Sequence, residues 1–195
     1  MIEKTCLVTG ANTGIGYAIS LGLAKMGATV IMVCRNKPRG EAAMTELKEK
    51  SGNSSISLFI ADLSSQTSIR QLVTDFKTKF GKLDILINNA AVITQNRTLT
   101  EDGLETQFAL NHLAPFLLTE LLLDSLKTSD SARIINISSN AHQTVNINFD
   151  DLQSEQSYKP KEEYQRTKLC NLLFTYELSR QLNGTHITAH CVHPG

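Results

Sequence analysis

The segment Thr9-Gly10-Ala11-Asn12-Thr13-Gly14-Ile15-Gly16 lies close to the start of this 195-residue chain and decides how it folds. An apolar run at residues 6–8 precedes it, and apolar residues at helical spacing follow it from Tyr17 to Met26. A strand, a glycine-rich turn and a helix in this order form a corner where the first backbone N–H groups of the helix can bind a phosphate. A glycine-rich turn taken alone is equally compatible with a simple loop, so the remaining sequence has to decide.

The rest of the chain alternates between apolar runs and helical patterns. The runs predict strands at residues 29–34, 56–60, 83–87, 133–138 and 186–192. The patterns predict helices at residues 38–50, 65–80, 104–126 and 162–182. Strict alternation predicts an α/β fold with a Rossmann-type, doubly wound parallel sheet and helices on both of its faces. No internal boundary interrupts the pattern, which indicates a single domain over residues 1–195.

Composition argues against several classes of function. The formal net charge is zero, so there is no electrostatic argument for binding nucleic acid or an anionic membrane surface. Cys6, Cys34, Cys170 and Cys191 are far apart and form no metal-ligand pair, which predicts no metal site and a reducing, cytoplasmic compartment. The chain has no signal peptide and no apolar run of membrane-spanning length. Peripheral association with a membrane stays open.

The pair Tyr164 and Lys168 is the first candidate for chemistry. The two residues are four apart, so on a helix both side chains lie on one face, with about 5–6 Å between their Cβ atoms. A free phenol has a pKa near 10 and is a poor base at neutral pH, but a neighbouring ammonium favours the phenolate. Tyr164 would then exchange a proton with an alcohol or a carbonyl while a hydride moves. Many helices carry such a pair on a solvated face, so the pair alone does not establish an enzyme.

The end of the second predicted strand, Val33-Cys34-Arg35-Asn36, indicates which dinucleotide is bound. Roughly 20 residues after the glycines, an acidic side chain would accept hydrogen bonds from the adenosine ribose and repel a 2′-phosphate. No acid stands here, and Arg35 offers a permanently charged fork for a phosphate, with Lys37 and Arg39 adding positive charge. The sequence therefore favours NADP over NAD, and a solvated surface role for Arg35 is the alternative.

The glycine spacing, Gly-x-x-x-Gly-x-Gly, resembles the turn of the short-chain dehydrogenase/reductase family. Asn88-Asn89-Ala90-Ala91, Ser138-Ser139 and Tyr164-x-x-x-Lys168 follow in that family's order. Ala91 departs from the family pattern, which has glycine there. Cys34-Arg35-Asn36, residues 138–142 and the long insert before Tyr164 are most similar to the retinol dehydrogenase branch, which is related to protochlorophyllide reductase and the WW-domain oxidoreductase.

The resemblance implies roles for further residues. Ser139 would hydrogen-bond the substrate oxygen, and Ser138 is the nearest alternative. Asn111 would kink the long helix and hold a water that links Lys168 to solvent, or would serve as a structural asparagine. Asp62 would contact the adenine ring or cap the next helix. The residues implied in cofactor binding are Gly10, Asn12, Thr13, Gly14, Ile15, Gly16, Arg35, Asn36, Asp62, Leu63, Asn89, Ala90, Tyr164 and Lys168.

The resemblance also implies a function. We expect an NADP(H)-dependent oxidoreductase that interconverts an alcohol and a carbonyl on a lipophilic, retinoid-, steroid- or aldehyde-like substrate. A catalytically silent dinucleotide-binding or interaction module is the alternative. A sugar-nucleotide epimerase shares the Tyr-Lys pair but generally has a shorter glycine spacing. Family dimers pair through helices that correspond to residues 104–126 and 162–182, so a homodimer is a further hypothesis.

The dipeptide Pro194-Gly195 ends the chain. In the family it is followed by a nicotinamide contact, a mobile substrate-covering segment and a seventh strand. We therefore expect a sheet that lacks its last strand. We also expect residues 1–195 alone to bind cofactor weakly and to turn over poorly.

Overall fold

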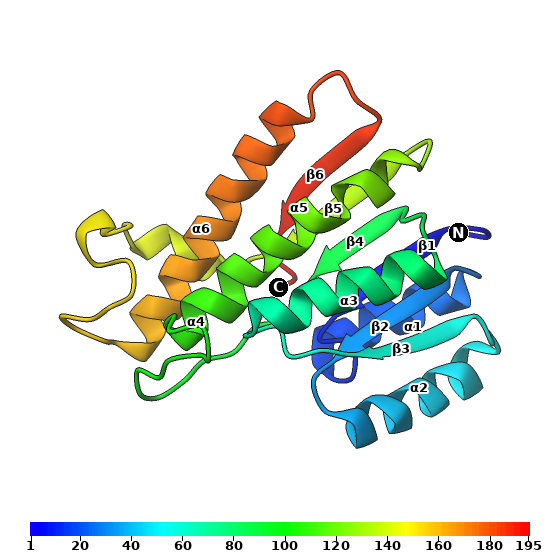
Figure 1. The fold of residues 1–195 in the computed structure, drawn as a ribbon, viewed down its shortest axis with the longest axis horizontal. Coiled ribbons are helices and arrows are strands. Elements are labelled where there is room, and N and C mark those ends of the chain that lie inside the picture. The colour runs from blue at the N-terminus through cyan, green and yellow to red at the C-terminus, as the bar shows by residue number, and fades with distance from the viewer.

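A six-stranded parallel sheet runs through the centre of the computed structural model, which describes residues 1–195 (Figure 1). The strands are β1 (Thr5–Thr9), β2 (Thr29–Cys34), β3 (Ile56–Ile60), β4 (Ile85–Asn88), β5 (Ala132–Ile137) and β6 (Ile187–Val192). Their order is β3-β2-β1-β4-β5-β6, and every neighbouring pair is parallel. The chain changes direction across the sheet between β1 and β4, where open α/β sheets place their ligands. The doubly wound parallel sheet expected from the sequence is confirmed.

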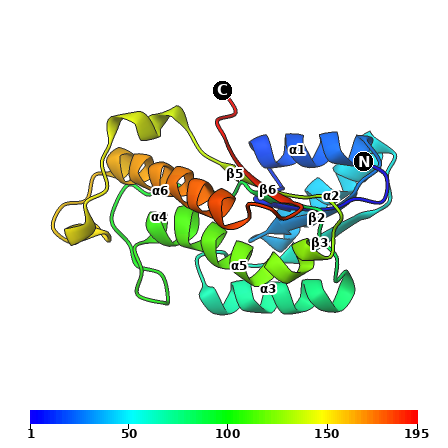
Figure 2. The ribbon, with the colours of Figure 1, turned by 90° about the horizontal axis from the view of Figure 1, so that it is seen from above.

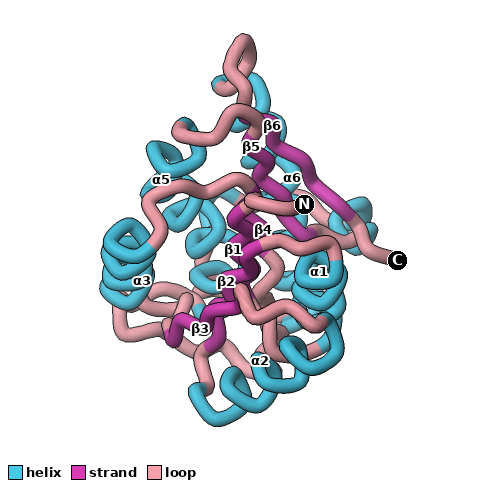
Figure 3. The backbone as a smooth tube through the Cα atoms, turned by 90° about the vertical axis from the view of Figure 1, so that its right-hand side faces the viewer, coloured by secondary structure: helices cyan, strands magenta, loops and turns pink.

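Helices cover both faces of the sheet (Figure 2). The long ones are α1 (Gly14–Lys25), α2 (Lys37–Ser51), α3 (Gln66–Lys79), α5 (Ala114–Lys127) and α6 (Pro160–Gln181). Helices α1 and α2 lie on one face, and α3, α5 and α6 lie on the other, so the strands run between two helical layers (Figure 3). None of the helices combines the length and the hydropathy that a membrane crossing requires.

The strands alternate their side chains between two hydrophobic clusters. Leu7, Ile31 and Leu86 contribute to a cluster of 21 buried residues on the α3, α5 and α6 face. Cys6 and Val8 contribute to a cluster of 15 buried residues on the α1 and α2 face. Both faces of each central strand are therefore buried, which explains why these runs are apolar throughout instead of alternating with polar residues.

The segment predicted as one helix over residues 104–126 is interrupted. A short helix α4 (Thr106–Phe108) is followed by a π-helical turn over Ala109–Leu113 and then by α5. Pro115 explains the interruption, because it has no N–H to donate to the carbonyl of Asn111 four residues earlier. The side-chain amide of Asn171, from α6, donates to that carbonyl at 2.8 Å instead. The π-turn therefore packs α5 against α6 next to a predicted site residue.

Candidate active site

A cleft of about 450 Å³ opens at the carboxyl ends of β1, β2, β3 and β4. We call it the nucleotide cleft. It is lined by all twelve residues predicted to bind cofactor outside the Tyr-Lys pair. These are Gly10, Asn12, Thr13, Gly14, Ile15, Gly16, Arg35, Asn36, Asp62, Leu63, Asn89 and Ala90. Six further lining residues were not predicted as contacts: Val33, Arg39, Ala61, Ala91, Val92 and Leu110. Of these, Arg39 stands out in the sequence for its positive charge and Ala91 for its departure from the family's glycine. The other four are apolar residues near predicted positions, and the sequence offers no further signal for them.

Each of the three glycines of the turn stands where the structure requires the absence of a side chain. Gly10 and Gly14 have φ angles of +64° and +54°, a region that residues with a Cβ rarely adopt. A Cβ at Gly14 would meet no atom within 4 Å, so its backbone borders open space in the cleft. A Cβ at Gly16 would overlap the carbonyl oxygen of Gly10 and lie 2.5 Å from the Nδ2 atom of Asn89. Gly16 therefore permits close packing of α1 on the strand ends, and Gly14 leaves room for a ligand.

The first turn of α1 has the properties of an anion site. Thr13 is the N-cap residue, and its side chain makes no capping hydrogen bond. The first turn carries no acidic side chain. The N–H groups at the start of α1 therefore face the cleft without an intrahelical partner, and the helix dipole adds partial positive charge. This arrangement fits a pyrophosphate.

The side chain of Asn89 joins β4 to the glycine turn. Its Nδ2 atom donates to the carbonyl oxygen of Thr9 at 2.8 Å. The hydroxyl of Thr9 in turn accepts from the backbone N–H groups of Asn89 and Ala90 at 2.8 and 3.0 Å. Thr9 entered the sequence analysis only as the first residue of the turn, but it fixes the position of the segment after β4. These hydrogen bonds therefore join the end of β1 to the end of β4 at the floor of the cleft.

The arginine end of the cleft differs in part from the prediction. Arg35 and Arg39 line the cleft, and neither guanidinium lies within ion-pair distance of an acid. Lys37 does not line the cleft and pairs with Glu41 at 3.9 Å on the exposed surface of α2, so its expected contribution to the local positive charge is indirect and stays a prediction. Asn36 lines the cleft, but its Oδ1 atom also caps α2 by accepting from the N–H of Arg39 at 3.0 Å. Of the three basic residues, only the two arginines line the cleft.

Asp62 lies in the cleft and does not cap the next helix. Its Oδ1 atom accepts from the N–H and the hydroxyl of Ser64, at 2.9 and 2.6 Å. Ser65 is the N-cap residue of α3. The alternative interpretation of Asp62 as a helix cap is therefore wrong. Leu63, beside it, is buried and lines the cleft with one side while it packs into the larger hydrophobic cluster.

Tyr164 and Lys168 lie on one face of α6, as their spacing predicts. The ammonium of Lys168 is 5.3 Å from the centre of the Tyr164 ring and donates to the carbonyl oxygen of Ile137, at the end of β5, at 2.9 Å. Burial lowers the pKa of Lys168 to about 8. Charge on this residue is therefore sensitive to pH near neutrality.

The pKa of Tyr164 is displaced in the direction opposite to the one predicted. Partial burial of the phenol raises its pKa above the ordinary value, because the phenolate loses hydration. The hydrogen bond found for the Lys168 ammonium goes to the Ile137 carbonyl and not to the phenol oxygen, which leaves two of its three N–H donors without a protein acceptor. The spacing in the sequence predicts that Tyr164 and Lys168 share a face of the helix. It does not indicate that the Ile137 carbonyl accepts a hydrogen bond from the Lys168 ammonium.

The two serines after β5 have distinct surroundings. Ser138 is buried, and its hydroxyl donates to the backbone carbonyl of Lys168 at 2.9 Å. Ser139 accepts from the N–H of Ala141 at 3.2 Å, and its own hydroxyl hydrogen has no acceptor. Ser139, the residue predicted to meet the substrate oxygen, therefore retains a free donor, whereas Ser138 holds β5 to α6.

Asn111 connects the nucleotide cleft to α6. Its side-chain amide accepts from the N–H of Val92 at 2.8 Å and donates to the carbonyl of the same residue at 2.9 Å. The same Nδ2 atom lies 3.3 Å from the hydroxyl of Thr167. Since Val92 lines the cleft, Asn111 bridges the cleft wall and the helix that carries Tyr164 and Lys168. The geometry places Asn111 as a structural link, and the water that it was predicted to hold stays a prediction.

A sequence model described as short chain dehydrogenase matches residues 4–195. The chain belongs to the short-chain dehydrogenase family. Within it, the relatives place the chain in the retinol dehydrogenase-like branch, as the sequence motifs predicted.

Three relatives illustrate the similarity. Retinol dehydrogenase 12 of Mus musculus is 46% identical over 192 residues, which are 98% of this chain and 61% of that protein. Polyprenol dehydrogenase of Homo sapiens is 43% identical over 99% of this chain and 60% of its own length. A metagenomic short-chain oxidoreductase solved in complex with NADP superposes with a TM-score of 0.82, at 25% identity, over 100% of this chain and 83% of that chain. The chain thus spans about three fifths of the curated relatives that it matches.

Proposed function

We propose that this protein is an NADP(H)-dependent oxidoreductase that interconverts an alcohol and a carbonyl by hydride transfer. The observation that carries the proposal is the nucleotide cleft, because twelve residues scattered between positions 10 and 90 converge on one anion-binding space. Asn111 joins this space to the helix that carries Tyr164 and Lys168. The residues fit a dinucleotide, since Gly14 borders open space and Gly16 brings α1 close to the strand ends.

The preference for NADP rests on the arginine end of the cleft. Arg35 and Arg39 line it without acidic partners, and no acid follows β2 to accept hydrogen bonds from the adenosine ribose. A 2′-phosphate would meet two planar, permanently charged groups there. The metagenomic relative was solved in complex with NADP, which supports the same assignment.

In the proposed mechanism, Tyr164 exchanges a proton with the substrate oxygen. The bound nicotinamide supplies or accepts the hydride. Ser139 donates its free hydroxyl hydrogen to the same substrate oxygen and stabilises the charge that develops on it. Lys168 brings an ammonium next to Tyr164, and its charge favours the phenolate once the phenol proton leaves. The raised pKa of Tyr164 suits a proton donor in the direction of carbonyl reduction.

We assign the substrate to lipophilic alcohols and carbonyls. The relatives include proteins named retinol dehydrogenase and polyprenol dehydrogenase, and both names denote apolar alcohols. This chain is 43 to 46% identical to them. Retinoid-, steroid- and long-chain aldehyde-like compounds are the candidates that follow.

The same proposal includes a homodimer and a reducing compartment. Phe116 on α5 and Leu173 and Tyr176 on α6 are 44, 47 and 64% exposed, which leaves apolar surface on the two helices that pair in family dimers. All four cysteines are free thiols, as expected for a cytoplasmic protein. Sedimentation at several protein concentrations measures the dimer, and a monomer at all of them excludes it.

A substrate and cofactor screen tests the proposed activity. The full-length gene product is purified and mixed with NADPH or NADH and with a matched series of aldehydes, from short polar to long apolar, and nicotinamide absorbance is followed. We expect NADPH oxidation that increases with the apolar length of the aldehyde. Tight NADPH binding without turnover of any compound would favour the silent dinucleotide-binding module instead. Equal rates with NADH would overturn the cofactor assignment.

A further inference from the structure

The segment between Ser139 and Tyr164 is held in place by the neighbours of Tyr164. We call residues 140–159 the insert. It contains two short 3₁₀-helices, at Asn140–Thr144 and Phe149–Asp151, and ends where α6 begins. One end of the insert therefore follows Ser139, and the other precedes Tyr164 by a few residues. The position of the insert therefore affects the position of the Ser139 side chain relative to that of Tyr164.

Residues on both sides of Tyr164 bind the insert. Gln165 donates to the hydroxyl of Thr144 at 3.0 Å. Glu163 accepts from the hydroxyl of Ser154 at 2.6 Å. Among residues 163–166, Tyr164 alone has a side chain without a hydrogen bond. The helical turn that carries the phenol is thus the turn to which the insert is attached.

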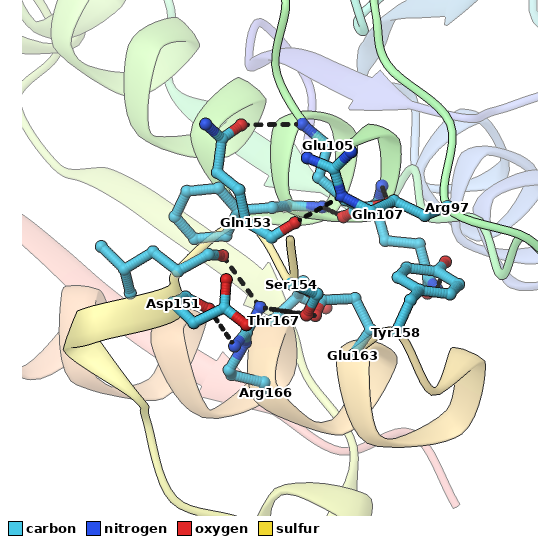
Figure 4. A network of polar contacts seen from close by, with 12 residues as sticks. Arg97, Glu105, Gln107, Asp151, Gln153, Ser154, Tyr158, Glu163, Arg166 and Thr167 are labelled. Atoms are coloured by element: carbon cyan, nitrogen blue, oxygen red, sulfur yellow. Dashed lines mark hydrogen bonds and ion pairs between the residues drawn. The ribbon is translucent and has the colours of Figure 1, made fainter. Parts of the chain in front are cut away.

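Arg166 makes the largest number of these bonds. Its guanidinium donates to the carbonyl oxygens of Asp151 and Leu152 at 2.9 and 2.8 Å and to the hydroxyl of Ser154 at 2.9 Å. It also pairs with Glu163 at 2.5 Å (Figure 4). Arg166 is 7% exposed and Glu163 is 2% exposed. A buried ion pair is a weak source of stability, but a planar fork that binds two adjacent carbonyls fixes their position closely.

The other side of the insert is bound to the loop before α4. Gln153 accepts from the backbone N–H of Glu105 at 3.0 Å, and its carbonyl accepts from Arg97 at 2.9 Å. Gln107 donates to the hydroxyl of Tyr158 at 2.6 Å. Figure 4 shows these contacts on the side of the insert opposite to Arg166. The insert is therefore a bridge between α6 and the segment that leads to Asn111.

We propose that Arg166 is a positioning residue for the reaction, which acts by fixing the insert against α6 and thereby setting Ser139 relative to Tyr164. The inference rests on the proposed oxidoreductase function. Arg166 does not line the nucleotide cleft and binds the insert instead, so we expect its removal to release the insert from α6 while dinucleotide binding is kept. Glu163 is the counter-ion that makes burial of the guanidinium possible.

The test compares Arg166→Met and Arg166→Lys with Arg180→Met. Arg180 is a matched control, because it lies on the same helix and pairs with an acid three residues away, but is exposed. We expect Arg166→Met to lower kcat by tenfold or more while the Kd for NADPH, measured by fluorescence, stays within twofold of the wild-type value. Arg166→Lys restores part of kcat, because it keeps the charge but binds fewer acceptors. Arg180→Met leaves kcat unchanged.

Limited proteolysis gives a readout that does not depend on activity. In Arg166→Met, cleavage within residues 144–158 precedes cleavage elsewhere, and in Arg180→Met the pattern matches the wild type. The double variant Glu163→Gln/Arg166→Met removes the unpaired buried charge and is used if the single variant does not fold.

The outcomes separate the two proposals. An unchanged kcat and an unchanged cleavage pattern overturn the inference alone. A loss of NADPH binding in parallel with kcat, or failure of the double variant to fold, also overturns it, because Arg166 is then a general folding determinant. A wild-type protein without turnover, combined with the expected cleavage difference, overturns the proposed function and leaves the anchoring of the insert standing.

Discussion

The nucleotide cleft differs in how its polar groups are used from the residues on and around α6, namely Asn111, Ser139, Tyr164 and Lys168, which we call the α6 site. In the cleft, Thr13 makes no capping bond, Gly14 borders open space and Arg35 has no acidic partner. In the α6 site, the ammonium of Lys168 is bound to the carbonyl of Ile137, and the amide of Asn111 is bound to Val92. The cleft keeps its polar groups available, whereas the α6 site has most of them engaged within the protein.

This difference indicates two separate tasks. A cleft with free N–H groups and free guanidinium groups is organised to receive charge from a ligand. A site whose groups are already bonded is organised to hold a few atoms at fixed distances. Substitutions in the cleft should therefore change ligand affinity, and substitutions around α6 should change the rate at a given occupancy.

Tyr164→Phe should show the largest effect and is the strictest test of this division. Loss of the phenol removes the proposed proton transfer, which typically contributes about 10²- to 10⁴-fold to a rate. We expect kcat to fall by that factor while the Kd for NADPH stays within about twofold. Steady-state kinetics and fluorescence titration measure the two quantities. A similar loss in both would show that the two regions are not separable.

Gly16→Ala should follow in size, because a Cβ there would overlap the Gly10 carbonyl oxygen. Overpacking against backbone typically costs about 1–3 kcal/mol, and we expect lower stability together with loss of NADPH binding. Gly22→Ala is the matched control within α1, since a Cβ at Gly22 meets nothing within 4 Å. That change should raise the free energy of unfolding by roughly 0.5–1 kcal/mol. Urea titration distinguishes the two, and equal effects would refute the packing role of Gly16.

Arg35→Ala should reduce the preference for NADPH over NADH by roughly 10- to 100-fold, the equivalent of one charge-assisted hydrogen bond. The ratio of the two dissociation constants is the measured quantity. Lys37→Ala is the control, because Lys37 pairs with Glu41 and does not line the cleft. It should leave the ratio within about twofold. A larger effect of Lys37→Ala than of Arg35→Ala would reverse the assignment of the phosphate site.

The smallest expected effect is on stability: in Lys168→Met, the pH dependence of the free energy of unfolding should change. The folded pKa of Lys168 is about 8 against an ordinary value of 10.5, so the unfolded chain holds the extra proton between these values. The free energy of unfolding of the wild type should therefore rise with pH in this window relative to the variant. The slope is at most about 1.4 kcal/mol per pH unit.

The difference between the two proteins isolates Lys168 from the other titrating groups. Burial raises the pKa values of Cys6, Cys34 and Cys170, so in the same window the unfolded chain loses their protons first and stability falls. Both proteins share this opposite contribution. Denaturant titrations from pH 7.5 to 9.5 provide the comparison, and parallel curves would show that Lys168 is not desolvated.

The sequence predicted the fold and the nucleotide cleft well, because both depend on local patterns. Helix α1 starts at Gly14, three residues before the predicted start, since two glycines in its first turn carry no helical signal. The strands agree to within about two residues. The glycine spacing and Arg35 identify the cleft because each acts through its own short segment.

The α6 site was predicted less completely because its geometry depends on distant partners. Tyr164 and Lys168 were found from their spacing, but the carbonyl of Ile137, 31 residues away, decides where the ammonium binds. Pro115 was a local signal for the π-turn, but the amide that binds the freed Asn111 carbonyl comes from Asn171, 60 residues away. Glu163 and Arg166 have the spacing of an ordinary solvated pair, and only the fold shows that they are buried. No pattern in the sequence distinguishes these cases.

The missing N–H of Pro115 has a consequence for engineering this chain. Replacing the proline with alanine would give the Asn111 carbonyl a donor of its own, in competition with the Asn171 amide. The straighter helix formed in this way would gain a backbone hydrogen bond and would be attached less firmly to α6. A change selected only for helical propensity would thus weaken the hydrogen bond that attaches the segment before α5 to α6.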